Sequence, residues 1–334
     1  MKYFITGSAG FIGFSLSKRL LSEGHTVFGI DNMNDYYDVN LKNSRLNELK
    51  HYSNFIFYNF DINEKDKIIP LCINENFDCI IHLAAQAGVR YSLKNPFAYA
   101  ESNLNGYLTI LESARQSKIP HLVYASSSSV YGVTDKVPFK TEMCTDFPVS
   151  LYAATKKANE LMAHSYSHIY RIPTTGLRFF TVYGPWGRPD MALFKFTEAI
   201  LNNTPIDIFN DGHLSRDFTY IDDIIEGIVR ISKSPPIEGN QLAIGTTINT
   251  PYKIYNIGNG KPTKLIDFIK ILEKEIGKSA LKNYLPMQDG DVYTTWADTD
   301  DLFKAIGYRP ETSLEDGVRN FISWYKSYYS TLNN

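Results

Sequence analysis

The sequence predicts an α/β protein built on a doubly wound parallel sheet, with a smaller mixed α/β domain in its second half. Short apolar runs alternate with amphipathic stretches through the first half of the 334 residues. Because parallel strands must be joined by crossovers, which are usually helices, this alternation favours a parallel sheet with ligand sites at the carboxyl ends of its strands. After about Arg178 the pattern loosens into shorter elements separated by turn-forming stretches. We therefore expect one domain over residues 1–180 and a second over residues 181–334, from which some segments can return to the first.

The individual elements follow from the position of each apolar run. The expected strands of the first half are Lys2–Thr6, Thr26–Asp31, Phe55–Asn59, Cys79–Leu83, His121–Ala125 and Thr174–Leu177. The helices expected between them are Ile12–Glu23, Glu64–Glu75, Phe97–Gln116 and Tyr152–Tyr170. In the second half we expect helices over Asp190–Asn202, Ile221–Ser232, Leu265–Ile276 and Ser313–Tyr329.

Composition and charge exclude several classes of protein. The chain is 43% hydrophobic and 21% charged, which is typical of a globular protein. A formal charge of −2 gives no general attraction to nucleic acid or to an anionic membrane, and no apolar stretch is long enough to span a bilayer. Cys72, Cys79 and Cys144 show neither a disulfide framework nor metal-ligand spacing. We expect a cytoplasmic protein without a metal site.

A glycine-rich turn after the first strand predicts a dinucleotide site. Gly7, Gly10 and Gly13 permit a tight turn, a close approach to a pyrophosphate and close packing of helix on strand, and the helix N-terminus favours the phosphates. Asp31, 18 residues past Gly13, ends the second strand, where a carboxylate can accept hydrogen bonds from the adenosine ribose. That carboxylate would repel a 2′-phosphate, so NAD is favoured over NADP. The alternative for the glycines alone is a tight structural turn.

Residues at the next two strand ends are further candidates for contact with the cofactor. Asp61 and Ile62 follow the third strand, and Leu83, Ala84 and Ala85 follow the fourth, where they could flank the adenine and its ribose. Taken alone, these residues are more commonly packing residues.

The sequence Tyr152-x-x-x-Lys156 is the candidate for acid–base chemistry. Its four-residue spacing places a phenol and an ammonium on one face of a helix, where the cation stabilises the phenolate. With 23 tyrosines, about one such spacing is expected by chance, and this is the single instance in the chain. Ser126, Ser127, Ser128 and Ser129 at the end of the fifth strand add hydroxyls that could bind a sugar oxygen. A serine-rich loop that merely solvates a strand end is the alternative.

The order of these motifs resembles the extended short-chain dehydrogenase/reductase family, whose cofactor domain is a Rossmann fold, and in particular its nucleotide-sugar epimerases. Residues 178–185, 216–223 and 296–298 are also similar to blocks of that family. Residues 31–37 and 187–192 look like the UDP-glucuronate 4-epimerases.

The resemblance implies a role for each matching position. Tyr152 would be the base, Lys156 would lower the pKa of Tyr152 and bind the nicotinamide ribose, and Ser127 would be the catalytic hydroxyl, with Ser128 or Ser129 beside the sugar. The remaining cofactor contacts would come from Phe11, Ile12, Asn32 and Phe179. Arg216 would grip the diphosphate of a UDP-sugar and Thr181 would lie beside the sugar, and Asp291 is a further candidate for contact with the substrate. The resemblance also implies a homodimer formed by the helices over 97–116 and 152–170.

The residues before Val130-Tyr131-Gly132 favour epimerisation. Family members oxidise C4 of the sugar, and the dehydratases and decarboxylases that the chain resembles then use an acidic residue at this place. Here Ser128 and Ser129 stand instead, and a hydroxyl transfers protons poorly at neutral pH.

A C6 carboxylate on the sugar would need a cation. Arg188 could pair with it bidentately, and Arg90 is a second candidate. We therefore expect a UDP-glucuronate 4-epimerase. A 4-epimerase of neutral or N-acetylated UDP-hexoses and a non-catalytic NAD or nucleotide-sugar sensor are the alternatives.

Overall fold

The computed structural model describes residues 1–239, 241–242, 246–247, 249–288 and 290–332. Seven strands form one sheet in the order β12-β6-β5-β4-β1-β2-β3, and each neighbouring pair is parallel. Its strands are β1 (Lys2–Thr6), β2 (Thr26–Ile30), β3 (Phe55–Tyr58), β4 (Cys79–His82), β5 (Leu122–Ser127), β6 (Thr174–Phe179) and β12 (Tyr252–Ile257). The predicted parallel sheet is confirmed.

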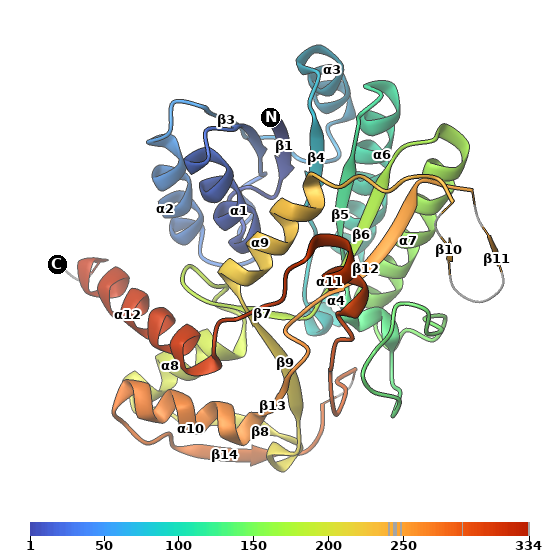
Figure 1. Cartoon of the computed structure of the whole chain (residues 1–334). Helices are drawn as coiled ribbons and strands as arrows, with labels where there is room; N and C mark the ends of the chain where they lie inside the picture. Colours follow the sequence, from blue (N-terminus) through green and yellow to red (C-terminus); the bar gives the residue numbers. More distant parts are fainter. Residues whose placement is uncertain (240, 243–245, 248, 289, 333–334) are drawn as a thin grey trace.

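Helices cover both faces of this sheet (Figure 1). On one face α1 packs against α9 and α2, and on the other α6 packs against α3 and α7. The bounds are α1 (Phe11–Ser22), α2 (Val39–Lys50), α3 (Lys65–Glu75), α6 (Gly106–Gln116), α7 (Leu151–Tyr170) and α9 (Ile221–Ser232). The apolar side chains that these helices share with the sheet form two clusters of buried residues, one on each face.

Two expectations about the first half need correction. The single helix expected over residues 97–116 is interrupted: α5 (Pro96–Tyr99) leads into a π-helix (Ala100–Asn105) before α6 begins. Asn103 lies in the π-helix, where its buried amide donates to Gln86 O and Thr155 Oγ1. The pattern analysis also missed α2, which begins after Asp38, whose side chain accepts a hydrogen bond from Asn40 N.

A smaller lobe of mixed structure lies beside the carboxyl ends of the sheet strands (Figure 1). It contains a sheet of order β13-β9-β7 and a pair β14-β8, with helices α8, α10 and α12. The bounds are β7 (Thr181–Tyr183), α8 (Ala192–Leu201), β8 (Ile206–Phe209), β9 (Ser215–Tyr220), β13 (Pro262–Lys264), α10 (Leu265–Ile276), β14 (Lys282–Leu285) and α12 (Leu314–Leu332). Three shorter elements complete the description, namely α4 (Val89–Lys94), α11 (Asp300–Ile306) and the hairpin β10–β11 (Gln241–Leu242, Thr246–Thr247).

The chain crosses between the two lobes more than once. After β9 it returns through α9, which packs on α1, and then β12 pairs with β6 at the edge of the large sheet. The second half therefore completes the first domain, and the division at residue 180 stays a prediction.

Apolar side chains are exposed along the helices for which a dimer was expected. Phe97 on α5 is 78% exposed and Leu161 on α7 is 61% exposed, and Leu108 on α6 and Ile169 on α7 are also exposed. The dimer itself stays a prediction. Among the described residues no helix is long and apolar enough to cross a membrane, and no group of acidic, histidine or cysteine side chains is arranged to hold a metal ion.

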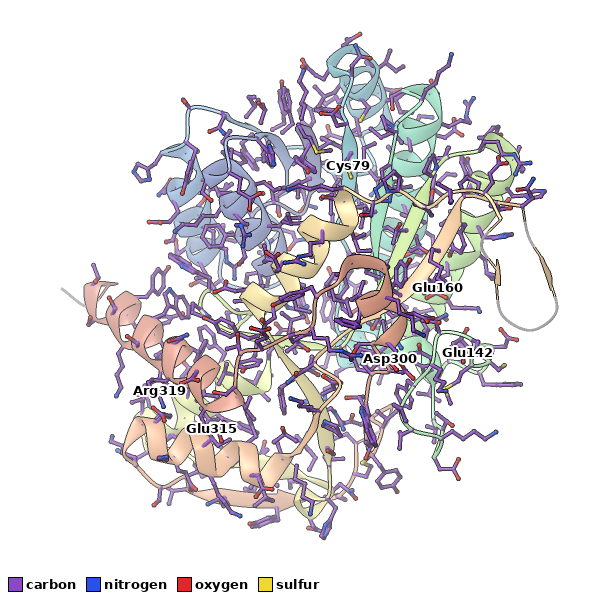
Figure 2. All side chains as sticks on the ribbon, in the orientation of Figure 1. Cys79, Glu142, Glu160, Asp300, Glu315 and Arg319 are labelled. Carbon is purple, nitrogen blue, oxygen red and sulfur yellow. The ribbon has the colours of Figure 1, made fainter. Side chains whose placement is uncertain are left out.

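A buried ion pair joins α7 to the sheet. Arg178 Nε and Nη2 on β6 donate to the two carboxylate oxygens of Glu160 on α7 at 2.8 and 2.9 Å, and both side chains are 3% exposed. Figure 2 shows Glu160 inside the molecule, between α7 and the sheet. Ser126 Oγ on β5 donates to the same carboxylate at 2.6 Å, so three elements meet at one charge.

We expect the Arg178→Met variant to lose about 3–5 kcal/mol of unfolding free energy, because it leaves the Glu160 carboxylate buried without its cation. Urea unfolding followed by circular dichroism measures this loss. The control is Lys270→Met, which removes an exposed pair with Asp267 and should cost under about 1 kcal/mol. Equal losses in the two variants would contradict the prediction.

Candidate active site

The turn between β1 and α1 has the geometry of a phosphate cradle. Gly7 N donates to Ile30 O at 2.8 Å and Gly10 N to Gly7 O at 2.9 Å, which folds the turn back on itself. A Cβ on Gly13 would lie 2.1 Å from Gly7 O, so only glycine fits there. Because no side chain caps the N-terminus of α1, its first N–H groups are available to an anion. These residues fit the pyrophosphate of a dinucleotide.

Asp31 lies at the end of β2 beside this turn, as expected. Its carboxylate accepts from Ala9 N at 3.2 Å and Met33 N at 2.9 Å, and Lys42 Nζ lies 3.8 Å away. Lys42 is a buried lysine of α2 that the sequence analysis missed. Burial lowers the pKa of the Lys42 ammonium, and the Asp31 charge partly restores it. A carboxylate with a neighbouring ammonium is suited to hold the two hydroxyls of a ribose.

The other strand-end residues differ in what they offer a cofactor. Asn32 Nδ2 donates to Asp61 Oδ2 at 2.7 Å, so these two side chains bind each other across the ends of β2 and β3. Leu83 N and Ala84 N donate to Thr6 Oγ1 at 3.1 and 3.0 Å, which fixes the chain after β4. The remaining candidates of this set are the buried Phe11, Ile62 and Phe179, and the partly exposed Ile12 and Ala85.

Tyr152 lies in the first turn of α7, where the chain places it beside the end of β5. Ser150 caps the helix by accepting from Ala153 N at 3.1 Å. Burial raises the pKa of the Tyr152 phenol, while a hydrogen bond with Ser127 and the charge of Arg188 lower it. Ser127, as expected, is therefore the serine of the run next to Tyr152, whereas Ser126 is turned toward Glu160.

Lys156 lies on the same face of α7 as Tyr152, but its ammonium donates to a backbone carbonyl of β5. Its Nζ donates to Ala125 O at 2.8 Å, and burial lowers its pKa to about 8. The charge of Arg188 lowers the pKa of the Tyr152 phenol, against the larger effect of burial. The predicted effect of Lys156 on the pKa of Tyr152 stays a prediction. Ser128 and Ser129 lie in the 3-10 turn after β5, where Ser127 Oγ donates to Ser129 Oγ at 3.1 Å.

The substrate candidates form two separate arginine groups. Arg188, near Tyr152, donates to both oxygens of Asp190, from Nε at 2.9 Å and from Nη2 at 2.5 Å. Tyr36 OH donates to the same Asp190 at 3.2 Å, and Tyr99 lies between this group and Tyr152, with its ring centroid 6.1 Å from that of Tyr152. The pairing of Arg188 with a sugar carboxylate stays a prediction, and in this structure Asp190 occupies its guanidinium.

The second group lies toward the smaller lobe. Arg216 Nη2 donates to Asp291 Oδ1 at 2.5 Å, so these two expected residues do meet. Arg90 stacks over the ring of Phe209 at 5.0 Å, and its charge is close enough to lower the pKa of Arg216 further, after the larger effect of burial. Thr181 is partly exposed on β7. Arg90 therefore belongs with Arg216 and not with Arg188.

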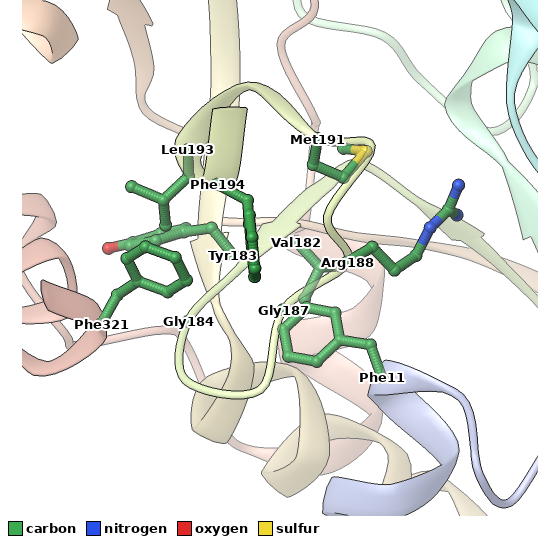
Figure 3. A pocket seen from close by; sticks show the side chains of 10 residues that line it. All are labelled: Phe11, Val182, Tyr183, Gly184, Gly187, Arg188, Met191, Leu193, Phe194 and Phe321. Atoms are coloured by element: carbon green, nitrogen blue, oxygen red, sulfur yellow. The ribbon is translucent and has the colours of Figure 1, made fainter. Parts of the chain in front are cut away.

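A small cavity marks the joint between the cofactor turn and the smaller lobe. Its lining includes Phe11 of α1, Arg188, and Phe194 and Phe321 from α8 and α12. Figure 3 shows the Arg188 guanidinium extending away from Phe194 and Phe321, with Phe11 below it. The cavity is therefore apolar on one side and bounded by a cation on the other.

Three of the residues that organise the site were missed by the sequence analysis along with Lys42. They are Tyr36, Arg45 and Asp190, of which Tyr36 and Asp190 stand within segments that the resemblance had singled out. Arg45 follows Lys42 by three residues on α2, so the helical spacing of the two cations was the signal that could have found them. Asp190 lies two residues after Arg188, a spacing that carries no signal by itself.

A parallel sheet with this glycine turn, followed by a Tyr-x-x-x-Lys helix after β5, defines an extended short-chain dehydrogenase/reductase. Residues 4–321 match the family described as GDP-mannose 4,6 dehydratase, and the chain belongs to that family.

Relatives within it carry more particular names. The chain is 50% identical over 334 residues to the probable UDP-glucuronate 4-epimerase of Rhizobium meliloti, with 98% of each chain covered. It is 51% identical to Protein CapI of Staphylococcus aureus, covering 98% of this chain and 99% of that protein. Among solved structures, the UDP-glucuronic acid 4-epimerase of Bacillus cereus in complex with UDP-glucuronic acid and NAD is 35% identical, with a TM-score of 0.88, covering 98% of this chain and 100% of that one.

We expect Gly13→Ala to abolish retention of NAD, because the new methyl group collides with Gly7 O and opens the turn. The NAD content of the purified protein, released by acid and measured enzymatically, gives the result. The control is Gly24→Asn, since an added Cβ at that left-handed turn meets nothing within 4 Å and asparagine tolerates the conformation. Full NAD occupancy in Gly13→Ala would refute the placement of the cofactor.

Proposed function

We propose that the protein is an NAD-dependent epimerase that inverts C4 of a UDP-hexuronic acid, converting UDP-glucuronate to UDP-galacturonate. The observation that carries the proposal is that Tyr99 lies next to both Tyr152 and Arg188: its ring centroid is 6.1 Å from that of Tyr152, and its hydroxyl and Arg188 Nη2 both lie within 4.0 Å of a Cβ built on Gly88. The charge of Arg188 accordingly lowers the pKa of the Tyr152 phenol. A base for the sugar hydroxyl and a cation for a sugar carboxylate thus lie at one place. The epimerase names of the relatives and of the solved neighbour support the same reading.

Each group has one task in this proposal. The glycine turn, Asp31 and Lys42 would hold NAD, which would supply the hydride acceptor and donor for oxidation and re-reduction at C4 of the sugar. Tyr152 takes the proton of the C4 hydroxyl and later returns it, while Ser127 hydrogen-bonds the same oxygen. Lys156 holds positive charge beneath the nicotinamide ribose. Arg216 and Arg90 bind the diphosphate end, Asp291 pairs with Arg216, and Arg188 binds the carboxylate, with Thr181 and Ser128 beside the sugar.

The family name includes dehydratases, but the residues near Tyr152 favour epimerisation. Elimination of water needs an acid and a base at C5 and C6, and decarboxylation is assisted by an acid. Ser128 and Ser129 occupy the positions next to Ser127, and neither hydroxyl transfers protons readily near neutral pH. Pairing with Arg188 would also disfavour loss of carbon dioxide, because the negative charge of the carboxylate would have to move away from the arginine in that step.

The location of the protein is part of the proposal. Cys72 and Cys79 are buried free thiols and Cys144 is an exposed one, which fits a reducing compartment. We place the protein in the cytoplasm.

We expect UDP-glucuronate to be converted to UDP-galacturonate without net reduction of added NAD, because the cofactor is regenerated in each cycle. A panel of UDP-glucuronate, UDP-glucose and UDP-N-acetylglucosamine, with products separated by anion exchange, tests this expectation. Tyr152→Phe, which removes the phenol oxygen, should lower turnover by about 10²–10⁴-fold. Product from the neutral sugars alone would favour a hexose epimerase, and no product from any sugar would favour a sensor.

We expect Arg188→Ala to lower kcat/KM for UDP-glucuronate about 10²-fold more than that for UDP-glucose, since a loss common to both sugars would report the effect of Arg188 on the pKa of Tyr152. A charge-assisted bidentate pair contributes about 2–3 kcal/mol, and only the uronate can form one. Steady-state kinetics with both sugars measures the ratio. Equal loss on both substrates would contradict the carboxylate role of Arg188.

A further inference from the structure

The guanidinium of Arg188 is occupied by a carboxylate of the protein. Nε donates to Asp190 Oδ1 at 2.9 Å and Nη2 to Asp190 Oδ2 at 2.5 Å, so the pair is bidentate. This edge of the guanidinium is the one that would hold a carboxylate of a ligand in the same parallel geometry. The Asp190 carboxylate therefore occupies the edge of the Arg188 guanidinium that the carboxylate of a uronate would bind.

Neighbouring residues keep Asp190 charged and oriented. Tyr36 OH donates to Asp190 Oδ2 at 3.2 Å, and the Tyr36 ring packs on Tyr91 with centroids 4.8 Å apart. Burial alone would raise the pKa of the Asp190 carboxyl, but Arg188 and Tyr36 lower it below its ordinary value. Without this acid, the buried charge of Arg188 would have no partner among the described residues.

The backbone of this loop is held independently of the pair. Arg45, fully buried on α2, donates from Nη2 to Trp186 O at 2.6 Å and from Nη1 to Ala9 O of the glycine turn at 2.9 Å. Trp186 adopts a left-handed φ of 63°, unusual for a bulky side chain, and its ring packs against Phe14 and Tyr328. An exchange of partner at Arg188 thus needs movement of side chains only.

We propose that Asp190 is an internal competitor for Arg188, which holds the arginine when no uronate is bound and yields it to the carboxylate of the sugar. The inference rests on the proposed function, because it takes the carboxylate of a UDP-uronic acid as the ligand of Arg188. A neutral sugar does not displace Asp190, so the competition weakens binding of uronates alone. Reversible release of an acidic product follows, since Asp190 takes the arginine back.

The competition can be measured by binding in a background that does not turn over. In Tyr152→Phe protein loaded with NAD, isothermal titration gives the Kd of UDP-glucuronate and of UDP-glucose before and after Asp190→Asn. Because the competent fraction with a free arginine rises, we expect the Kd of UDP-glucuronate to fall about 3- to 10-fold and that of UDP-glucose to stay within about twofold. Tyr36→Phe should also lower the Kd of UDP-glucuronate, by a smaller factor, and leave that of UDP-glucose nearly unchanged.

A matched control separates this effect from a general change of charge. Asp291→Asn removes the acid partner of the other arginine, Arg216, and should alter the affinity of both sugars equally, since both carry the same diphosphate. Weaker binding of UDP-glucuronate in Asp190→Asn would overturn the inference by showing that Asp190 positions Arg188 for the sugar. An unchanged Kd, or an equal change for both sugars, would overturn it as well.

Failure of the proposed function would look different. The wild-type protein is assayed in parallel for UDP-galacturonate formation. Absence of that product would contradict the epimerase and the inference together, whereas an active wild type with an unaltered Kd in Asp190→Asn would contradict the inference alone.

Discussion

The geometry of the site depends on one buried ion pair, that of Glu160 and Arg178. Both side chains are 3% exposed, so their desolvation is costly and is offset only because their hydrogen bonds are complete. The pair fixes α7 against β6, and the Ser126 hydroxyl adds β5. Tyr152 lies on that same helix, and Ser127 is next to Ser126. The Glu160–Arg178 pair therefore helps to fix the position of Tyr152 relative to Ser127.

The exclusion of water by this packing opposes ionisation of the Tyr152 phenol. Burial raises the pKa of its phenol, which makes the phenolate harder to form, and two neighbours oppose this effect through a hydrogen bond and a positive charge. Burial lowers the pKa of Lys156 to about 8, so its ammonium also retains charge less readily than a free lysine. A bound, positively charged nicotinamide and its ribose would add to these influences. The activated base is therefore a property of the complex and not of the Tyr-x-x-x-Lys spacing alone.

The sequence pattern predicted the large sheet well, but it predicted the contacts between the two lobes poorly. Strands such as β1 and β4 are continuous apolar runs bounded by turns, and these signals are local, so their limits were found within one or two residues. The π-helix was not predicted, because residues 97–116 were interpreted as one continuous helix and a π-helix differs from an α-helix in its hydrogen bonds. The spacing of the glycines and of Tyr152 indicates their candidate roles, whereas Arg188 and Asp190 become a pair only through the fold of their loop. Tyr252 of β12 pairs with Thr174 of β6, 78 residues earlier in the chain.

The two arginines proposed to bind the anionic groups of the ligand are already paired with acidic residues. Arg188 has Asp190 and Arg216 has Asp291, and both pairs are mostly buried. No large positive patch is therefore needed, which is consistent with a net charge of −2. The binding free energy that a ligand anion gains at either arginine is its own interaction minus that of the acid it replaces. A single weak contact therefore adds little affinity. A ligand that carries a diphosphate at one end and a carboxylate at the other would gain at both arginines, whereas a ligand with one anionic group would gain at one.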